Sequence, residues 1–262
     1  MGEAIIARRG GSGEVIVEFE SFTPSNTVAM YHPDGELVRS TPTALSAARR
    51  YLAGASVGNY ALFAGGYDGS YRNTVDAYNT SLTRSTPTAL SAKRSSLAGA
   101  SVGNYALFAG GYRDSYRNTV NAYNTELVRS TPTALSTVRS GLAGASVGNY
   151  ALFAGGYGNG YRDTVDAYNA SLVRSTPTGL SAARTRLAGA SVGNYALFAG
   201  GYRDSYRSTV DAYNASLVRS TPTGLSAARY ELAGASVGNY ALFAGGDSAN
   251  GYRDTVDAYN AS

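Results

Sequence analysis

The segment LAGASVGNYALFAGGYDGSYRNTVDAYNTSLTRSTPTAL, residues 52–90, contains four short runs with strand propensity, separated by turn signals. The runs are LAGASV, YALFAGG, TVDAY and LTRSTP, and none has helical apolar spacing over a useful length. Gly58-Asn59, between the first two runs, suits a tight hairpin. Pro87 ends the fourth run and cannot donate to a β-ladder, so this run fits an outer edge. The segment therefore predicts a meander of four antiparallel strands.

This unit recurs with a period of 45 residues, which is marked by the prolines of STPT and the asparagines of VGNY: Pro42, Pro87, Pro132, Pro177 and Pro222, and Asn59, Asn104, Asn149, Asn194 and Asn239. A four-stranded unit with a period of about 40 to 50 residues is typical of a propeller blade. We therefore predict an all-β fold, a β-propeller of four-stranded antiparallel blades. The first strand carries small residues that suit the crowded axis. One phenylalanine per unit is expected to pack between blades: Phe63, Phe108, Phe153, Phe198 and Phe243.

Several residues of the unit resemble kelch repeats. Gly65-Gly66 closes an apolar strand, a tyrosine and then the TVxxY strand follow, and Arg49 precedes Gly65 by sixteen residues. The unit departs from the family near the blade end, where arginine replaces the usual tryptophan: Arg39, Arg84, Arg129, Arg174 and Arg219. The near-identical copies are also similar to amplified kelch-like arrays in bacterial and phage-borne surface proteins. The resemblance implies a propeller, usually of six blades, and the departure questions the interblade packing at those points.

The number of blades depends on the two ends of the chain, because the last unit stops at Ser262, before its fourth strand. In the preferred interpretation, residues 1–44 form a complete divergent blade and the propeller has six blades. In the alternative, LVRST from the amino-terminal region completes the last blade, so the propeller has five blades and the amino terminus is a cap or arm. In both, residues 1–262 form a single propeller, and 45–262 are five repeats of about 45 residues.

The copies differ mainly at two places, the pair after the recurring arginine and the connector after Gly-Gly. Successive turns of an up-and-down blade alternate between faces, so both places are expected on one side of the propeller. They carry residue types that paratopes use for contact area and hydrogen bonding. The predicted ligand-binding face consists of Arg50, Tyr51, Tyr67, Asp68, Ser95, Ser96, Tyr112, Arg113, Asp114, Ser140, Tyr157, Asn159, Thr185, Arg186, Tyr202, Arg203, Asp204, Tyr230, Glu231, Asp247 and Asn250. Drift in exposed turns is the alternative explanation.

Composition argues against several function classes. The chain has no cysteine and one histidine, His32, which argues against a classical catalytic triad or a multi-histidine metal centre. Candidate acids and bases recur in every blade instead of forming one asymmetric constellation, so we expect no enzyme, catalytic residue, metal or cofactor. The net charge of +4 is small and the arginines are spread among acids, so no nucleic-acid partner is expected. No apolar run could span a membrane or serve as a signal peptide, which predicts a soluble chain without membrane insertion.

These observations lead to two hypotheses about function. The first is a nonenzymatic recognition module that binds a protein or glycan on the variable face, as in an adhesin on a bacterial cell or virion surface. The alternative is a structural module that self-associates through unpaired edge strands.

Overall fold

The computed structural model describes residues 6–9, 15–18 and 39–261. All regular elements in these ranges are β-strands, and no helix there is long and apolar enough to cross a membrane. The chain divides into two compact units, Met1–Thr41 and Pro42–Ser262. In the first unit, β1 (Ile6–Arg9) pairs antiparallel with β2 (Val15–Glu18) as a two-stranded sheet.

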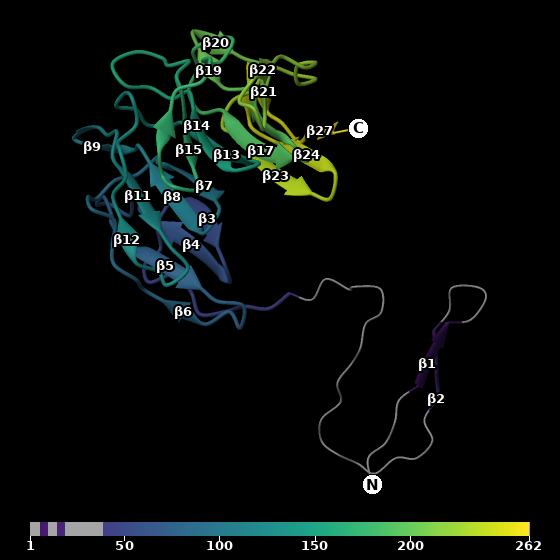
Figure 1. Cartoon of the computed structure of the whole chain (residues 1–262). Coiled ribbons are helices and arrows are strands. Elements are labelled where there is room, and N and C mark those ends of the chain that lie inside the picture. Colours follow the sequence, from purple (N-terminus) through teal and green to yellow (C-terminus); the bar gives the residue numbers. More distant parts are fainter. Residues whose placement is uncertain (1–5, 10–14, 19–38, 262) are drawn as a thin grey trace. The chain divides into compact units, whose positions relative to one another are not determined.

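The second unit is a β-propeller of five blades, which confirms the predicted fold class (Figure 1). Four blades have four antiparallel strands each, in chain order from the axis outward, and the fifth has three. The blades are β3 (Ala53–Val57), β4 (Tyr60–Ala64), β5 (Val75–Tyr78) and β6 (Arg84–Ser85); β7 (Ala98–Val102), β8 (Tyr105–Ala109), β11 (Val120–Tyr123) and β12 (Arg129–Ser130); β13 (Ala143–Val147), β14 (Tyr150–Ala154), β15 (Val165–Asn169) and β16 (Arg174–Ser175); β17 (Ala188–Val192), β18 (Tyr195–Ala199), β21 (Val210–Asn214) and β22 (Arg219–Ser220); and β23 (Ala233–Val237), β24 (Tyr240–Ala244) and β27 (Val256–Asn260).

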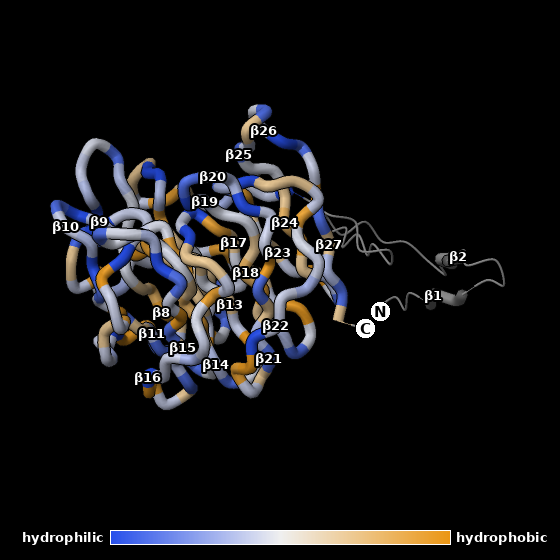
Figure 2. The backbone as a smooth tube through the Cα atoms, turned by 90° about the horizontal axis from the view of Figure 1, so that it is seen from above, coloured by the Kyte–Doolittle hydropathy of each residue, from blue (hydrophilic) through white to orange (hydrophobic). Residues whose placement is uncertain are grey.

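Three of the connectors after Gly-Gly form short hairpins of their own. These are β9 (Tyr112–Arg113) with β10 (Ser115–Tyr116), β19 (Tyr202–Arg203) with β20 (Ser205–Tyr206), and β25 (Asp247–Ser248) with β26 (Gly251–Tyr252). In Figure 2 the hydrophobic stretches follow the blade strands, whereas hydrophilic residues concentrate on the connecting loops. The connectors are therefore the part of each unit that burial constrains least.

The first strands of successive blades lie side by side around the axis, in the order β3, β7, β13, β17 and β23. They approach so closely that a Cβ atom at Gly99 would collide with the carbonyl oxygen of Gly54, and Gly144 meets Gly99 in the same way. This close approach explains why the first strand of every unit is built from small residues.

Hydrophobic side chains from two neighbouring blades form each core. Between the third and fourth blades, Val147, Leu152 and Val165 pack against Phe198 and Tyr213 of the next blade. Four of the five recurring phenylalanines behave as predicted: Phe108, Phe153, Phe198 and Phe243 are fully buried. Each interblade interface thus combines a face of small aliphatic residues with a face that carries Phe and Tyr.

A buried arginine joins the link segment to the strands of each blade. In the third blade, Arg139 Nη2 donates to the carbonyl of Phe153 at 3.1 Å and to Asp166 Oδ2 at 2.6 Å. The pairs Arg49–Asp76, Arg184–Asp211 and Arg229–Asp257 are equivalent, but the second blade has Arg94 with Asn121. Arg174 lies 3.5 Å from the other oxygen of Asp166. Arginine in place of the usual tryptophan is therefore compatible with well-packed blades.

The structure has five blades instead of the preferred six. Residues 19–38, which were expected to supply strands of a first blade, lie outside the described residues, so the interpretation of 1–44 stays a prediction. Arg39 and Ser40 belong to no strand, and β27 has no fourth strand beside it in the described part of the chain. The closure by amino-terminal LVRST is consequently not formed in the described residues.

Within the described residues, the ring of blades is open between the fifth and first blades. In the described residues, no contact between β23 and β3 matches those that join the other first strands. β23 is exposed along its whole length, and Phe63 is 36% exposed whereas its counterpart Phe108 is 0% exposed. The 45-residue period of the sequence predicts the blade. The angle between neighbouring blades depends on side-chain packing, and this angle determines whether the last blade reaches the first.

Candidate functional site

The backbone ties together the two variable places of each blade. In the first blade, Arg50 N donates to the carbonyl of Tyr67 at 3.0 Å, and Tyr67 N donates back to that of Arg50 at 2.8 Å. The same pairing joins Ser95 to Tyr112, Ser140 to Tyr157, Thr185 to Tyr202 and Tyr230 to Asp247. The link before the first strand and the connector after the second strand therefore lie on the same side of the propeller, as the alternation of turns predicts.

The second residue of each variable pair has a left-handed backbone. Its φ is 58° at Tyr51, 54° at Ser96, 61° at Gly141, 56° at Arg186 and 55° at Glu231. From Ser96 onward these residues also form a chain of backbone hydrogen bonds, because the N–H of each donates to the carbonyl of the equivalent residue one blade earlier, at 2.7 to 3.0 Å. Only the third blade has glycine there, so the other four residues hold a conformation that costs about 1 kcal/mol or more.

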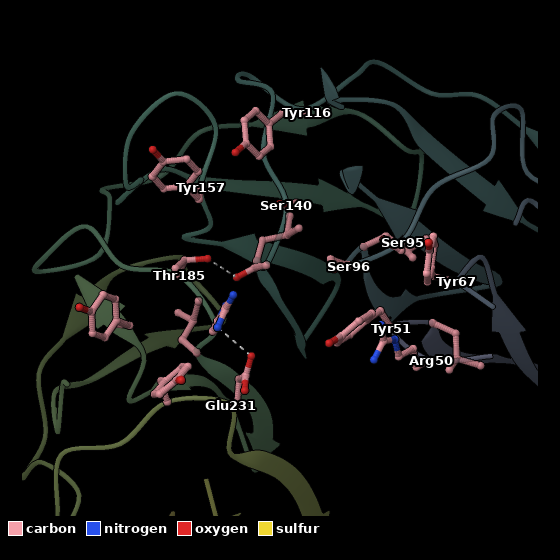
Figure 3. Close-up of a pocket in the computed structure, with 18 of the residues that line it drawn as sticks. Arg50, Tyr51, Tyr67, Ser95, Ser96, Tyr116, Ser140, Tyr157, Thr185 and Glu231 are labelled. Atoms are coloured by element: carbon pink, nitrogen blue, oxygen red, sulfur yellow. Dashed lines mark hydrogen bonds and ion pairs between the residues drawn. The ribbon is translucent and has the colours of Figure 1, made fainter. Parts of the chain in front are cut away.

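The variable pairs line one cavity of about 1270 Å³ (Figure 3). Among the predicted site residues, the lining includes Arg50, Tyr51, Tyr67, Ser95, Ser96, Ser140, Tyr157, Thr185, Arg186, Tyr202, Tyr230 and Glu231. The lining also includes one leucine per blade, the residue directly before each first strand. The structure thus brings all five variable pairs, which are distant in sequence, to a single hollow.

The other predicted site residues lie outside the lining. Arg113 with Asp114 and Arg203 with Asp204 lie in the β9–β10 and β19–β20 hairpins, where each aspartate side chain is 77% exposed. Asp68 is held by Arg72, whose Nη2 lies 2.7 Å from Asp68 Oδ2. The set is completed by Tyr112, Asn159, Asp247 and Asn250, which belong to the same connectors. The connectors therefore contribute to the cavity mainly through their tyrosines.

A chain of tyrosines surrounds the cavity. Adjacent rings meet edge to face or tilted, with centroids 5.2 to 6.3 Å apart, in the order Tyr67, Tyr71, Tyr112, Tyr116, Tyr157, Tyr161, Tyr202, Tyr206 and Tyr230. Sequence comparison of the copies missed Tyr71, Tyr116, Tyr161 and Tyr206, because these positions do not vary. Their recurrence every 45 residues beside a variable connector is the signal that could have found them.

Two tyrosines of this chain, Tyr71 and Tyr116, hold their hydroxyl protons more tightly than a free phenol does. Desolvation, followed by neighbouring phenols, raises the pKa of Tyr71 and of Tyr116 above the ordinary value of 10. Each phenol can therefore donate and accept hydrogen bonds while its ring offers an apolar face. The wall of the cavity combines flat apolar surface with hydroxyl groups.

Three charged side chains belong to the lining, namely Arg50, Arg186 and Glu231. Arg186 Nη1 lies 3.0 Å from Glu231 Oε1, and its guanidinium lies 5.6 Å from the ring centre of Tyr230. Arg50 lies over Tyr51 and Tyr67, at 5.0 and 5.8 Å from the ring centres. Among the described residues, no carboxylate lies within ion-pair distance of Arg50. This arginine is therefore the cation of the cavity that is available to a ligand.

The invariant turns on the opposite side have structural roles. Asn79 Oδ1 accepts from Ser81 N at 3.1 Å and from Thr83 N at 2.9 Å, which closes the turn after the third strand. A Cβ atom at Gly58 would come within 3.1 Å of Thr125 in the next blade. Packing between blades is thus sufficient to explain why these turns are constant. The constancy of these turns therefore does not indicate a binding site on the other side, whereas the cavity does.

No protein-family model and no curated protein matches the chain. Across residues 6–9, 15–18 and 39–261, no group of three or more His, Cys, Asp or Glu side chains is arranged to hold a metal ion.

Proposed function

We propose that this chain is a nonenzymatic recognition module, similar to kelch proteins, that binds a protein or glycan in the tyrosine-lined cavity. The observation that carries the proposal is the convergence of all five variable pairs on one hollow. Tyrosine, serine and arginine supply rigid contact area and adaptable hydrogen bonds at low entropic cost. We propose no nucleic-acid partner, because only two of the lining side chains are basic and one of these is paired with Glu231.

The unpaired Arg50 indicates the chemistry of the ligand. A guanidinium flanked by aromatic rings forms charge-assisted hydrogen bonds with a carboxylate. Acidic sugars and the side chains of Asp and Glu both carry this group, so the ligand is a carboxylate-bearing glycan or an acidic protein surface.

The test compares the chain with a triple variant, Tyr51→Ala, Arg186→Ala and Tyr230→Ala, on arrays of acidic glycans, neutral glycans and acidic peptides. We expect the variant to lose roughly 30-fold or more in affinity, because aromatic and arginine side chains dominate binding energy. The matched control is Val128→Ala, Val173→Ala and Val218→Ala, three exposed side chains outside the cavity. Equal capture by both variants would refute the site, and chemical turnover of a captured glycan would refute the nonenzymatic role.

A second candidate function, self-association through an edge strand, is favoured by β27, which has no fourth strand beside it in the described residues. Mass measurement over a range of concentrations distinguishes the two functions. A strict monomer removes the assembly function and leaves recognition unaffected.

A further inference from the structure

The two blades at the opening expose opposite halves of the same interface. Between formed blades, an aliphatic face packs against a face that carries Phe and Tyr, as Val192 and Val210 do against Phe243. The fifth blade leaves its aliphatic face uncovered: Val237 is 60% exposed, whereas its counterpart Val192 is 4% exposed. We call this face, formed by β23, β24 and β27, the fifth-blade face.

The first blade leaves the complementary half uncovered. Its exposed surface contains a hollow of about 520 Å³ lined in part by Leu45, Leu52, Phe63 and Tyr78. These residues include the phenylalanine and tyrosine whose counterparts, Phe108 and Tyr123, are fully buried against the preceding blade. We call this surface the first-blade face.

Hydrogen-bond chains that run around the propeller also stop at the opening. Ser101, Ser146, Ser191 and Ser236 each donate from Oγ to the carbonyl of the preceding serine, at 2.6 to 2.7 Å. Ser56, the first member, makes no such bond to an earlier blade among the described residues. The chain of left-handed residues likewise ends, because Tyr51 N donates to no carbonyl in the described part. Both ends therefore offer polar groups in the positions that a neighbouring blade uses.

The size of the opening follows from the repeat itself. The four formed interfaces join near-identical blades by the same contacts, so each rotates the chain by a similar angle about the axis. Five blades related by this angle do not complete a full turn, so the fifth blade does not reach the first. The circle consequently has room for additional blade structure.

We propose that the opening binds a further blade of the same 45-residue repeat. Such a blade presents its Phe and Tyr to the fifth-blade face and its aliphatic side to the first-blade face. It also continues the serine and left-handed hydrogen-bond chains in register. This partner is favoured over an unrelated apolar surface because both uncovered faces continue an interface that the molecule already forms four times.

The test extends the full chain at Ser262 with a copy of residues 172–216, which follow Ala170-Ser171 as the extension follows Ala261-Ser262. A shorter extension, a copy of residues 172–177, adds only a fourth strand to the last blade. We expect the long extension to raise the unfolding midpoint by roughly 5 °C or more above the short one, without a change in oligomeric state. Equal midpoints would overturn the proposal.

A charged substitution locates the effect on the fifth-blade face. Val237→Asp is expected to leave the unextended chain unchanged, because this side chain is already mostly exposed. In the long extension, the same substitution should abolish the gain in midpoint. A gain that persists would show that the added blade lies elsewhere. An unextended chain that dimerises, and loses the dimer through Val237→Asp, would make a second copy the occupant and would also overturn the proposal.

Discussion

The second and third blades share a buried arginine but give it different partners. Arg139 meets the carboxylate of Asp166 at 2.6 Å, whereas Arg94, equally buried, meets the amide oxygen of Asn121 at 3.0 Å. Both also donate to the carbonyl of a phenylalanine, at 3.1 Å. The hydrogen-bonded geometry is thus common to both blades, while the neutralising charge is present in only one. The comparison separates the contribution of geometry from that of charge.

The electrostatic consequence appears in the arginine itself. Burial lowers the pKa of Arg94 to about 10. Burial also lowers the pKa of Arg139, and Asp166 opposes that shift. An unpaired buried charge is costly because its desolvation is not compensated. The second blade is therefore expected to be the less stable of the two.

The largest effect on stability is expected when the aspartate that pairs with the buried arginine of the third blade is replaced by asparagine, the residue that the second blade has there. Asp166→Asn keeps the oxygen that accepts from Arg139 but removes its charge, which should lower the free energy of unfolding by about 3 kcal/mol. Urea unfolding measures this difference. The matched control is Asp114→Asn, which changes an exposed carboxylate in the neighbouring blade. An unchanged midpoint for Asp166→Asn would mean that geometry alone stabilises the blade.

The reverse substitution should stabilise the second blade. Asn121→Asp supplies Arg94 with a counter-charge, and we expect a gain of about 1 to 2 kcal/mol in the free energy of unfolding. The gain should be smaller than the loss above, because Asn121 Nδ2 already donates to Thr131 Oγ1 at 3.3 Å, and the Thr131 hydroxyl must turn to donate to the new carboxylate. A loss of stability on Asn121→Asp would show that the second blade is adapted to the amide.

The advantage of Asn121→Asp should depend on pH. The folded pKa of Arg94 lies below its unfolded value, so above pH 10 the unfolded chain binds more protons and this residue destabilises the fold less. The difference in unfolding free energy between variant and parent should therefore shrink as pH rises through about 10. Parallel urea titrations from neutral pH upward measure it, and contributions from the tyrosines cancel in the difference. A constant difference would contradict the buried-cation explanation.

The smallest effect concerns the left-handed position, which is Ser96 in the second blade and Gly141 in the third. Ser96→Gly should stabilise the chain by about 0.5 to 1 kcal/mol, since glycine adopts this φ without strain. Gly141→Ala should destabilise it, because the added Cβ would lie 2.6 Å from Thr185 Oγ1. Thermal unfolding of both variants checks the sign. Equal midpoints would show that the backbone there carries no strain.

Much of the blade could be predicted from the sequence. The 45-residue period, the Gly58-Asn59 hairpin and the recurring phenylalanines determine a four-stranded unit, because turns and strand faces depend on local residue types. The opening between the fifth and first blades could not be predicted in this way. It depends on the angle between packed blades, which small differences in side-chain contact decide.

The candidate site was predictable only in part. The alternation of turns correctly placed both variable places on one side, but the constant tyrosines Tyr71 and Tyr116 were invisible to a search for variation. Among the recurring connector arginines of the described residues, Arg72 binds a nearby aspartate, Asp68. Arg117 and Arg207 instead donate to the backbone carbonyls of Arg113 and Arg203. Which partner an arginine in a turn can contact depends on the backbone conformation of that turn, and residue type alone does not specify this conformation.

The left-handed residues around the cavity contact their neighbours through main-chain atoms, whatever side chain they carry. The same left-handed backbone conformation is adopted by tyrosine, serine, glycine, arginine and glutamate in five successive copies. The main-chain hydrogen bonds therefore form with any of these five side chains, so the positions tolerate exchange with the changes in stability given above. A combinatorial library that randomises the five together would keep one scaffold while changing its chemistry at the hollow, as hypervariable loops do on an antibody framework.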